Sequence, residues 1–190
     1  MLIEDGLFDR IDFTVKPMEK GEYDNCVFAN CNFSDSDLKE IIFVDCTFDT
    51  CNLSMAKLSN TTIRDCAFKC CKMLGLRFTD CNQFGLSASF DRCNLNLSSF
   101  YKTKFKKTLF TACTLNEVDF TDSDFTGSVF TECDFAKARF ETTALEKADF
   151  RTSVNYSIDP GRNRIKKAKF AFPGVTGLLD TYDIEIDLTK

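Results

Sequence analysis

The chain has 190 residues, with 24 basic and 29 acidic side chains and a formal net charge of −5. This length fits one domain with a substantial core. Histidine is absent, which removes the commonest general base and metal ligand, and the sequence shows neither a signal-peptide pattern nor eighteen consecutive apolar residues. We therefore expect a cytoplasmic protein with no membrane span and no cofactor.

Large apolar residues recur every five positions over the first part of the chain. The segment LFDRIDF places Phe8 and Phe13 five residues apart, where we expect them to close the N-terminal end. From residue 23 the row continues as Tyr23, Phe28, Phe33, Leu38, Phe43, Phe48, Leu53, Leu58, Ile63, Phe68, Met73 and Phe78. After one slip in phase it resumes at Phe90 and runs to Phe150, with only Phe or Leu at thirteen consecutive positions.

Neither a helix nor a flat strand can use a period of five. Five residues turn an α-helix by about 140°, so the row would cross every face. In a flat strand an odd step alternates sides. The chain must therefore turn within each pentad, and stacked coils would bury the apolar row as the core of a β-solenoid.

The cysteines predict how many sides each coil has. Most of the eleven lie two positions before an apolar centre, where nearly all other occupants are small. Three sets are spaced by twenty residues: Cys26, Cys46 and Cys66; Cys31, Cys51 and Cys71; Cys93, Cys113 and Cys133. Twenty residues make a four-sided coil. If the slip before Phe90 is a two-residue insertion, the last two sets form one ladder of six buried thiols.

This pattern resembles the pentapeptide-repeat family, in which a small residue and often Asp or Asn precede Leu or Phe. The resemblance covers roughly residues 21–154 and is carried by ANCNFSDSDL, FTDSDFTGSVF and LEKADFR. It implies an all-β fold, a right-handed quadrilateral β-helix, which we expect to occupy residues 1–172.

Residues 79–89, TDCNQFGLSAS, interrupt the repeat and contain Gly85. We expect a loop that leaves the coil. Loops on rigid scaffolds often carry function, although a tolerated irregularity is the alternative.

Residues 173–190 differ in kind from the repeat. Pro173 suggests the start of a short helix, and 183–187 alternate as a strand would. Solenoid ends need caps, so this segment should cover the last coil or pair with a second copy in an isologous homodimer. The residues expected at a dimer interface are Leu178, Leu179, Tyr182, Ile184 and Ile186; an intramolecular cap is the alternative.

The thiols and carboxylates give no strong sign of catalysis. Metal sites need short ligand pairs and a convergent geometry, whereas these cysteines follow the repeat. Only Cys70 is expected to point outward. No carboxylate pair stands out as acid and base, so we expect no enzyme; a redox protein using Cys70 or Cys81 is a further alternative.

Charges spaced by twenty residues should stack on the surface. Eight such pairs are complementary: Glu19/Lys39, Lys20/Glu40, Asp37/Lys57, Asp49/Lys69, Lys102/Asp122, Lys104/Asp124, Glu117/Lys137 and Asp119/Arg139. The unpaired acids gather in the first half, where Asp45 should stack on Asp65. We take as candidate partner-binding residues Glu22, Asp24, Asp35, Asp45, Asp65 and Asp80, with Gln83 and Phe84 on the loop; plain solvated charge is the alternative.

A narrow acidic rod has the outline of a DNA duplex, and a net negative chain is not expected to bind nucleic acid directly. The loop and the ending AKFAFPGVTGLLDTYDIEID are similar to the quinolone-resistance (Qnr-type) branch of the family. That resemblance implies a C-terminal dimer that mimics DNA, binds DNA gyrase or topoisomerase IV and protects them from fluoroquinolones. The alternative is a general protein-interaction scaffold with another partner.

Overall fold

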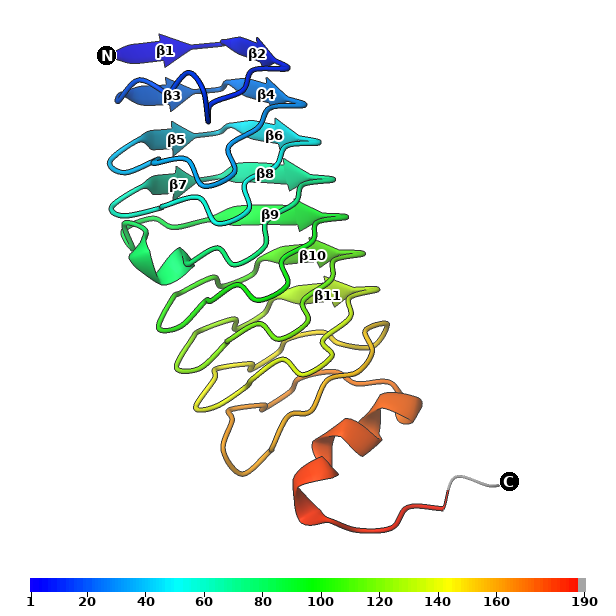
Figure 1. Ribbon diagram of the computed structural model, residues 1–190. Helices are drawn as coiled ribbons and strands as arrows, with labels where there is room; N and C mark the ends of the chain where they lie inside the picture. The colour runs from blue at the N-terminus through cyan, green and yellow to red at the C-terminus, as the bar shows by residue number, and fades with distance from the viewer. Residues whose placement is uncertain (188–190) are drawn as a thin grey trace.

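The computed structural model describes residues 1–187 as a stack of short parallel strands along one axis (Figure 1). The N-terminal strands lie at one end of the rod and the C-terminal segment at the other. Each strand pairs with the strand one coil away, twenty residues along the chain in most of the stack. The expected β-solenoid is therefore confirmed, and its strands begin at Leu2, upstream of the recognisable repeat.

Two sides of the coil form continuous sheets. Sheet A contains β1 (Leu2–Glu4), β3 (Glu22–Asp24), β5 (Ile42–Val44) and β7 (Thr62–Arg64). Sheet B contains β2 (Leu7–Asp9), β4 (Val27–Ala29), β6 (Thr47–Asp49), β8 (Cys66–Lys69), β9 (Ala88–Asp91), β10 (Leu109–Thr111) and β11 (Val129–Thr131). The other two sides are joined by isolated parallel bridges, such as Asn32 to Asn52 and Asp37 to Lys57. Four sides to a coil are thus confirmed.

The chain turns because a residue after each side takes a positive φ. Asn25 and Asn30 have φ values of 50° and 55°, and Asp45 has 50°. Asn and Asp tolerate this left-handed region better than other non-glycine residues, because their short polar side chains can hydrogen-bond locally. Three extended residues followed by one such corner explain why the strands are so short.

The core is built from columns of stacked phenylalanine rings. Along sheet B the ring centroids of Phe90 and Phe110 lie 4.7 Å apart, and those of Phe110 and Phe130 lie 5.0 Å apart. Rings from adjacent sides meet edge to face, as Phe100 and Phe105 do at 5.3 Å. Both arrangements are favoured by the charge distribution of aromatic rings. The five-residue apolar row therefore lies inside the coil.

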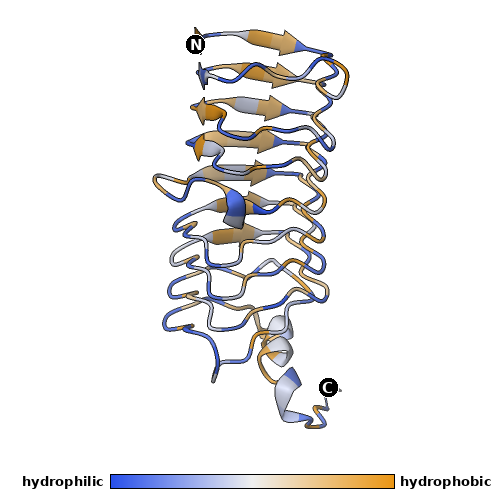
Figure 2. Cartoon of the chain, turned by 60° about the vertical axis from the view of Figure 1, so that its left-hand side comes forward, coloured by the Kyte–Doolittle hydropathy of each residue, from blue (hydrophilic) through white to orange (hydrophobic). Residues whose placement is uncertain are grey.

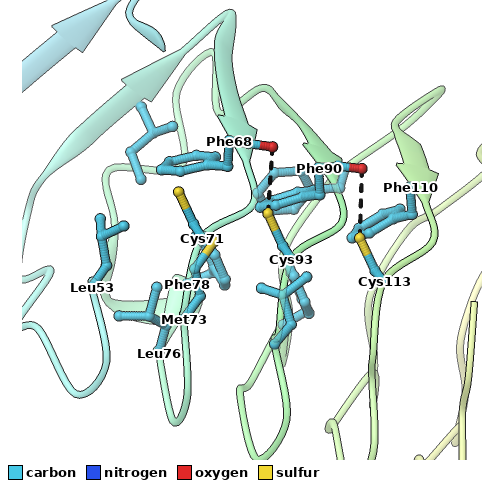
Figure 3. Packing of buried hydrophobic residues seen from close by; sticks show 14 of the residues in the cluster. Leu53, Phe68, Cys71, Met73, Leu76, Phe78, Phe90, Cys93, Phe110 and Cys113 are labelled. Carbon is cyan, nitrogen blue, oxygen red and sulfur yellow. Dashed lines mark hydrogen bonds between the residues drawn. The ribbon is translucent and has the colours of Figure 1, made fainter. Parts of the chain in front are cut away.

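The buried thiols line the same core beside these rings (Figure 3). Cys31, Cys51, Cys71, Cys93 and Cys113 each donate to a backbone carbonyl of the preceding coil. Cys133 continues the column, and its backbone N–H donates to the hydroxyl of Ser153. All eleven cysteines are free. The ladder of six thiols is confirmed.

The last coils lead into a short helical segment at the C-terminal end of the rod (Figure 1). It contains the 3-10 helices η2 (Phe172–Leu178), with Pro173 in its first turn, and η3 (Asp180–Tyr182). The expected helix is present, but the expected strand over 183–187 is not. Asp183 has a φ of 49°, and within residues 1–187 no neighbouring strand pairs with this segment. An alternating pattern alone cannot hold a strand without a partner edge.

Candidate protein-interaction surface

The structure places several of the candidate acidic residues along one edge of the rod. Glu22 and Asp24 lie on β3, while Asp45 and Asp65 occupy the corners that follow β5 and β7. Asp45 donates its N–H to the carbonyl of Arg64 at 2.9 Å, which fixes its place in the stack. We call the border between sheets A and B in this half the acidic edge, and define it by its carboxylates Glu4, Asp5, Asp24, Asp45 and Asp65; Arg64 lies on the same border, in register with Glu4 and Asp24.

Two other candidate acids lie elsewhere. Asp35 sits on the corner between the two bridged sides, where its N–H donates to the carbonyl of Ser54, so it does not join the acidic edge. Asp80 begins the loop on the far border of sheet A, and Arg77 donates to its carboxylate at 3.0 Å. The structure therefore brings Asp24, Asp45 and Asp65 to one edge and leaves Asp35 and Asp80 apart, while Glu22 lies at the opposite end of β3 from that edge.

The loop follows the 3-10 helix η1 (Phe78–Asp80) and projects from the stack beside sheet A (Figure 2). The side-chain amide of Gln83 donates to the carbonyls of Phe78 at 3.0 Å and Cys81 at 2.9 Å. The Asn82 carboxamide accepts from the N–H of Phe84 at 3.1 Å. The loop is thus held by its own side chains, and the Gln83 side chain, although exposed, bonds to the backbone of the loop.

Phe84 stands at the tip of this fixed loop with 80% of its surface exposed. The next apolar residue, Leu86, is buried. Gly85, with a φ of 70°, lies between them over Arg64, whose Nε would be 3.3 Å from a Cβ at that position. The loop therefore buries one apolar side chain and presents the other, next to the acidic edge.

The base of the loop is attached to the acidic edge itself. The hydroxyl of Ser87 donates to the Asp65 carboxylate at 2.9 Å and accepts from the Asp65 N–H at 2.8 Å. Hydroxyl donation to a carboxylate is a charge-assisted bond. The position of the loop and that of Asp65 are therefore set together.

The same border turns basic beyond the loop, which the sequence reasoning missed. Its residues there are Lys106, Lys107, Thr126, Gly127, Glu146, Lys147, Lys166 and Lys167, and N–H to carbonyl bonds such as Lys107 to Thr126 stack them. This set contains five lysines and one glutamate. We call this part the basic edge, and its five lysines define it. Following one corner residue through steps of twenty would have revealed it.

Some of the charged residues that were predicted to stack in adjacent coils form ion pairs. Lys20 and Glu40 form one at 2.8 Å. Asp124 lies beside Lys104 in register, but its ion pair is with Lys106 at 3.1 Å. All these groups are partly exposed, and such pairs contribute about 0 to 1 kcal/mol each. Such pairs influence the alignment of adjacent coils more than they stabilise the fold.

The thiols divide sharply by exposure. Cys70 is exposed, as expected, and the other ten are buried. Burial raises the pKa of the Cys81 thiol to about 12, so it is a poor nucleophile at neutral pH. Within residues 1–187 no group of three Cys, Asp or Glu side chains could hold a metal ion, and no helix there is long and apolar enough to span a membrane.

The C-terminal candidates fall into two groups. Leu178 packs against the core, and the carbonyl of Gly177 accepts from the N–H of Ile158 at 2.8 Å, so this part caps the last coil. Tyr182 and Ile184 are more than half exposed, and Ile186 is 39% exposed. Leu179 is intermediate. The cap therefore uses only the first of these apolar side chains.

The comparison with known families follows the same repeats. A family model described as a pentapeptide repeat region matches residues 22–87 and 86–150. The chain belongs to the pentapeptide-repeat family. The match begins one coil after the first strands of this pentapeptide-repeat protein and ends at the last full phenylalanine pentad.

Solved structures support the same fold. A trypsin-treated form of QnrB1, a plasmid-mediated fluoroquinolone resistance protein, matches this pentapeptide-repeat protein with a TM-score of 0.63 at 19% identity, over 98% of this chain and 99% of that one. Full-length QnrB1 matches with a TM-score of 0.58 at 18% identity, over 97% and 100% of the two chains. No curated protein sequence matches the chain. At these identities the likeness shows the fold.

Proposed function

We propose that this protein is a non-catalytic cytoplasmic protein that binds a type II topoisomerase, DNA gyrase or topoisomerase IV, in place of DNA and protects it from fluoroquinolones. The observation that carries the proposal is the acidic edge beside a fixed loop that displays Phe84. Carboxylates repeated along a rod, one strand spacing of about 4.8 Å apart, present a regular anionic surface to a basic groove.

The likeness to QnrB1 supports the proposal at the level of shape, because that protein is described as a fluoroquinolone resistance protein. A DNA-binding groove is lined with cations that ordinarily meet phosphates. The acidic edge offers Asp45 and Asp65 from successive coils, and the Phe84 ring can bury apolar surface at its side. Such an interaction needs no catalytic group in this chain.

The C-terminal segment is proposed to form a homodimer. Tyr182, Ile184 and Ile186 remain exposed after the segment has capped its own coil. An isologous contact between two copies would bury these side chains. Leu179 lies beside them, whereas Leu178 belongs to the cap.

The basic edge favours a second candidate function, a protein-interaction scaffold with a different partner. Lys107, Lys147 and Lys167 oppose any mimicry of DNA along that half of the rod. A scaffold could instead use both signs of charge to orient its partner.

A gyrase supercoiling assay, with and without ciprofloxacin, separates the two candidates. The topoisomerase proposal expects protection of supercoiling from the drug, or inhibition of the enzyme, at micromolar protein. The absence of both effects would leave the scaffold as the better account. A charge-neutralised Asp45→Asn and Asp65→Asn variant should lose the effect, and an Asp35→Asn variant, away from the acidic edge, should keep it.

A further inference from the structure

The side of the rod that carries sheet A at the N-terminal end becomes basic beyond the loop. Parallel bridges join its first outward column, which is Lys104, Asp124, Ala144 and Arg164. The basic edge borders this column on the same side. We call the column and the basic edge together the basic face. It holds seven cations and two carboxylates, Asp124 and Glu146, in a chain whose net charge is −5.

Both carboxylates on the basic face are already engaged. Lys106 pairs with Asp124 at 3.1 Å, and Arg164 pairs with Glu146 at 3.3 Å. The other five cations are exposed lysines that form no ion pair within residues 1–187: Lys104, Lys107, Lys147, Lys166 and Lys167. The stacked coils hold these like charges close together, so an anionic partner lowers their mutual repulsion.

The basic face does not form a pocket for one small anion. The backbone N–H groups that could surround such an anion are used within the stack, because Lys107, Gly127 and Lys147 each donate theirs to a carbonyl of the next coil. The lysines are spread over about 14 Å of the rod, at about 4.8 Å for each coil. Each lysine is a point charge on a flexible stem. This arrangement fits a partner whose anions repeat along its length.

A hollow of about 480 Å³ lies on the basic face. Five of its eight lining residues are basic: Lys106, Lys147, Arg164, Lys166 and Lys167. Thr126, which also lines it, and the adjoining Gly127 are short residues between coils that carry lysines. The surface is therefore shaped to receive a convex polyanion.

The uncharged residues of the basic face indicate which polyanion fits. None of them is aromatic, so the face has no platform on which unpaired bases could stack. None is an exposed large apolar residue, whereas protein interfaces bury an apolar centre. A nucleic-acid duplex needs neither feature, because it carries about one charge per 1.7 Å of its axis. A length of about 14 Å therefore carries about eight phosphates.

We propose that the basic face binds the phosphodiester backbone of duplex DNA, without reading its sequence. The net charge of the whole chain predicts no contact with nucleic acid, but that charge is distributed unevenly along the rod. Asp65, on the acidic edge, precedes β8, and Lys107 precedes β10, two coils or about 10 Å further on. That is about one Debye length at 0.1 M salt, so the repulsion from the acidic edge is largely screened. The inference goes beyond the topoisomerase proposal and does not depend on it.

Fluorescence anisotropy with a labelled duplex of about 20 base pairs tests this proposal on the full-length protein. We expect binding at about 50 mM salt, with a slope of about −4.5 in the logarithm of affinity against that of salt, because five unpaired lysines would release counterions. Two duplexes of unrelated sequence should bind equally. A single strand of the same length should bind less tightly, since its charges are further apart.

Two double variants with the same change in net charge locate the contact. Lys147→Gln with Lys167→Gln removes two unpaired cations from the basic face, so it should weaken binding at least about tenfold and make the salt slope shallower by about two. The matched control is Lys57→Gln with Lys72→Gln, at exposed lysines on the two bridged sides. It should bind within about twofold of the native chain, because charges beyond a Debye length are screened. Circular dichroism melting checks that both variants fold.

The proposal is overturned if the duplex does not bind at low salt, or if the two double variants lose the same affinity. Competition by polyglutamate of matched charge as effective as that by DNA would also overturn it, and would assign the face to an acidic protein. The Asp45→Asn and Asp65→Asn variant separates this inference from the topoisomerase proposal. That variant should lose the effect on the enzyme and bind DNA as tightly as the native chain or more tightly.

Discussion

The thiol of Cys93 donates to the carbonyl oxygen of Phe68 at 3.4 Å, 25 residues back along the chain (Figure 3). Along the same column Cys71 and Cys113 make the equivalent bond to a residue 23 positions back. The two extra residues are therefore absorbed in the loop, and the ladder passes it without a break. The loop is an insertion into an otherwise uninterrupted core, which is why it can be rigid.

We expect one cysteine of the eleven to react quickly with a thiol reagent in the native protein. Cys70 is exposed, while the others lie in the core and are protected until the coils open. A colourimetric thiol titration should show one fast equivalent and ten more after denaturation. Cys70→Ser should abolish the fast phase, and a second fast thiol would contradict the exposure seen in the structure.

The protein should lose stability in alkali. Burial raises the pKa of the Cys81 thiol to about 12. The pKa of this thiol in the folded state thus exceeds its value of about 8.5 in the unfolded chain. Its contribution to stability is complete below about pH 8.5 and is lost as the pH rises towards 12.

Ionisation of Cys81 should cost up to about 1.4 kcal/mol per pH unit in this range. Denaturant unfolding at pH 7, 9 and 10 measures the effect. Cys81→Ala should flatten the alkaline slope while lowering stability at pH 7 only modestly. A slope that Cys81→Ala leaves unchanged would argue against this thiol as a source.

Replacing one central ring should destabilise the rod strongly. Phe110 is fully buried and stacks on Phe90 and Phe130 at 4.7 and 5.0 Å. Phe110→Ala should lower the free energy of unfolding by about 3–5 kcal/mol, because it removes buried surface and leaves a cavity. Phe110→Leu should cost less, since leucine occupies equivalent positions. A loss below 1 kcal/mol in Phe110→Ala would show that the column can close over the gap.

Two loop variants should distinguish a side chain that contacts the partner from one that only holds the loop in place. Phe84→Ala should leave the melting temperature unchanged, because the ring is 80% exposed, and should weaken any topoisomerase protection. Gln83→Ala removes the amide that bonds the carbonyls of Phe78 and Cys81, so it should lower stability by about 1 kcal/mol and weaken protection through a looser loop. Full protection by Phe84→Ala would remove this ring from the proposed contact.

Polar substitutions at the C-terminus should abolish the proposed terminal dimer without unfolding the rod. Tyr182, Ile184 and Ile186 are exposed, so Ile184→Asp with Ile186→Asp removes no core contact. The mass in solution, measured by light scattering, should fall from dimer to monomer. Leu178→Asp serves as the contrast, because it should lower the melting temperature by damaging the cap. A native chain that is monomeric at all concentrations would rule out this dimer.

The repeat by itself determined the inside of the molecule. A period of five fixes which side chains point inward. Cysteines spaced by twenty residues fix four sides to each coil, because residues stacked on each other in adjacent coils occupy equivalent environments. Even the continuation of Cys71 into Cys93 followed from counting. The strand expected over 183–187 did not form, because its alternating pattern says nothing about a partner edge.

The outside was decided by tertiary structure, because surface residues carry no comparable steric requirement. Asp35 and Asp45 look alike in sequence, yet they occupy different corners, and only Asp45 belongs to the acidic edge. The partner-binding role of Gln83 stays a prediction, and only the structure shows that its amide also ties down the loop that exposes Phe84. The opposed acidic and basic edges emerge only when one corner is followed through every coil, past an insertion whose path the sequence leaves open.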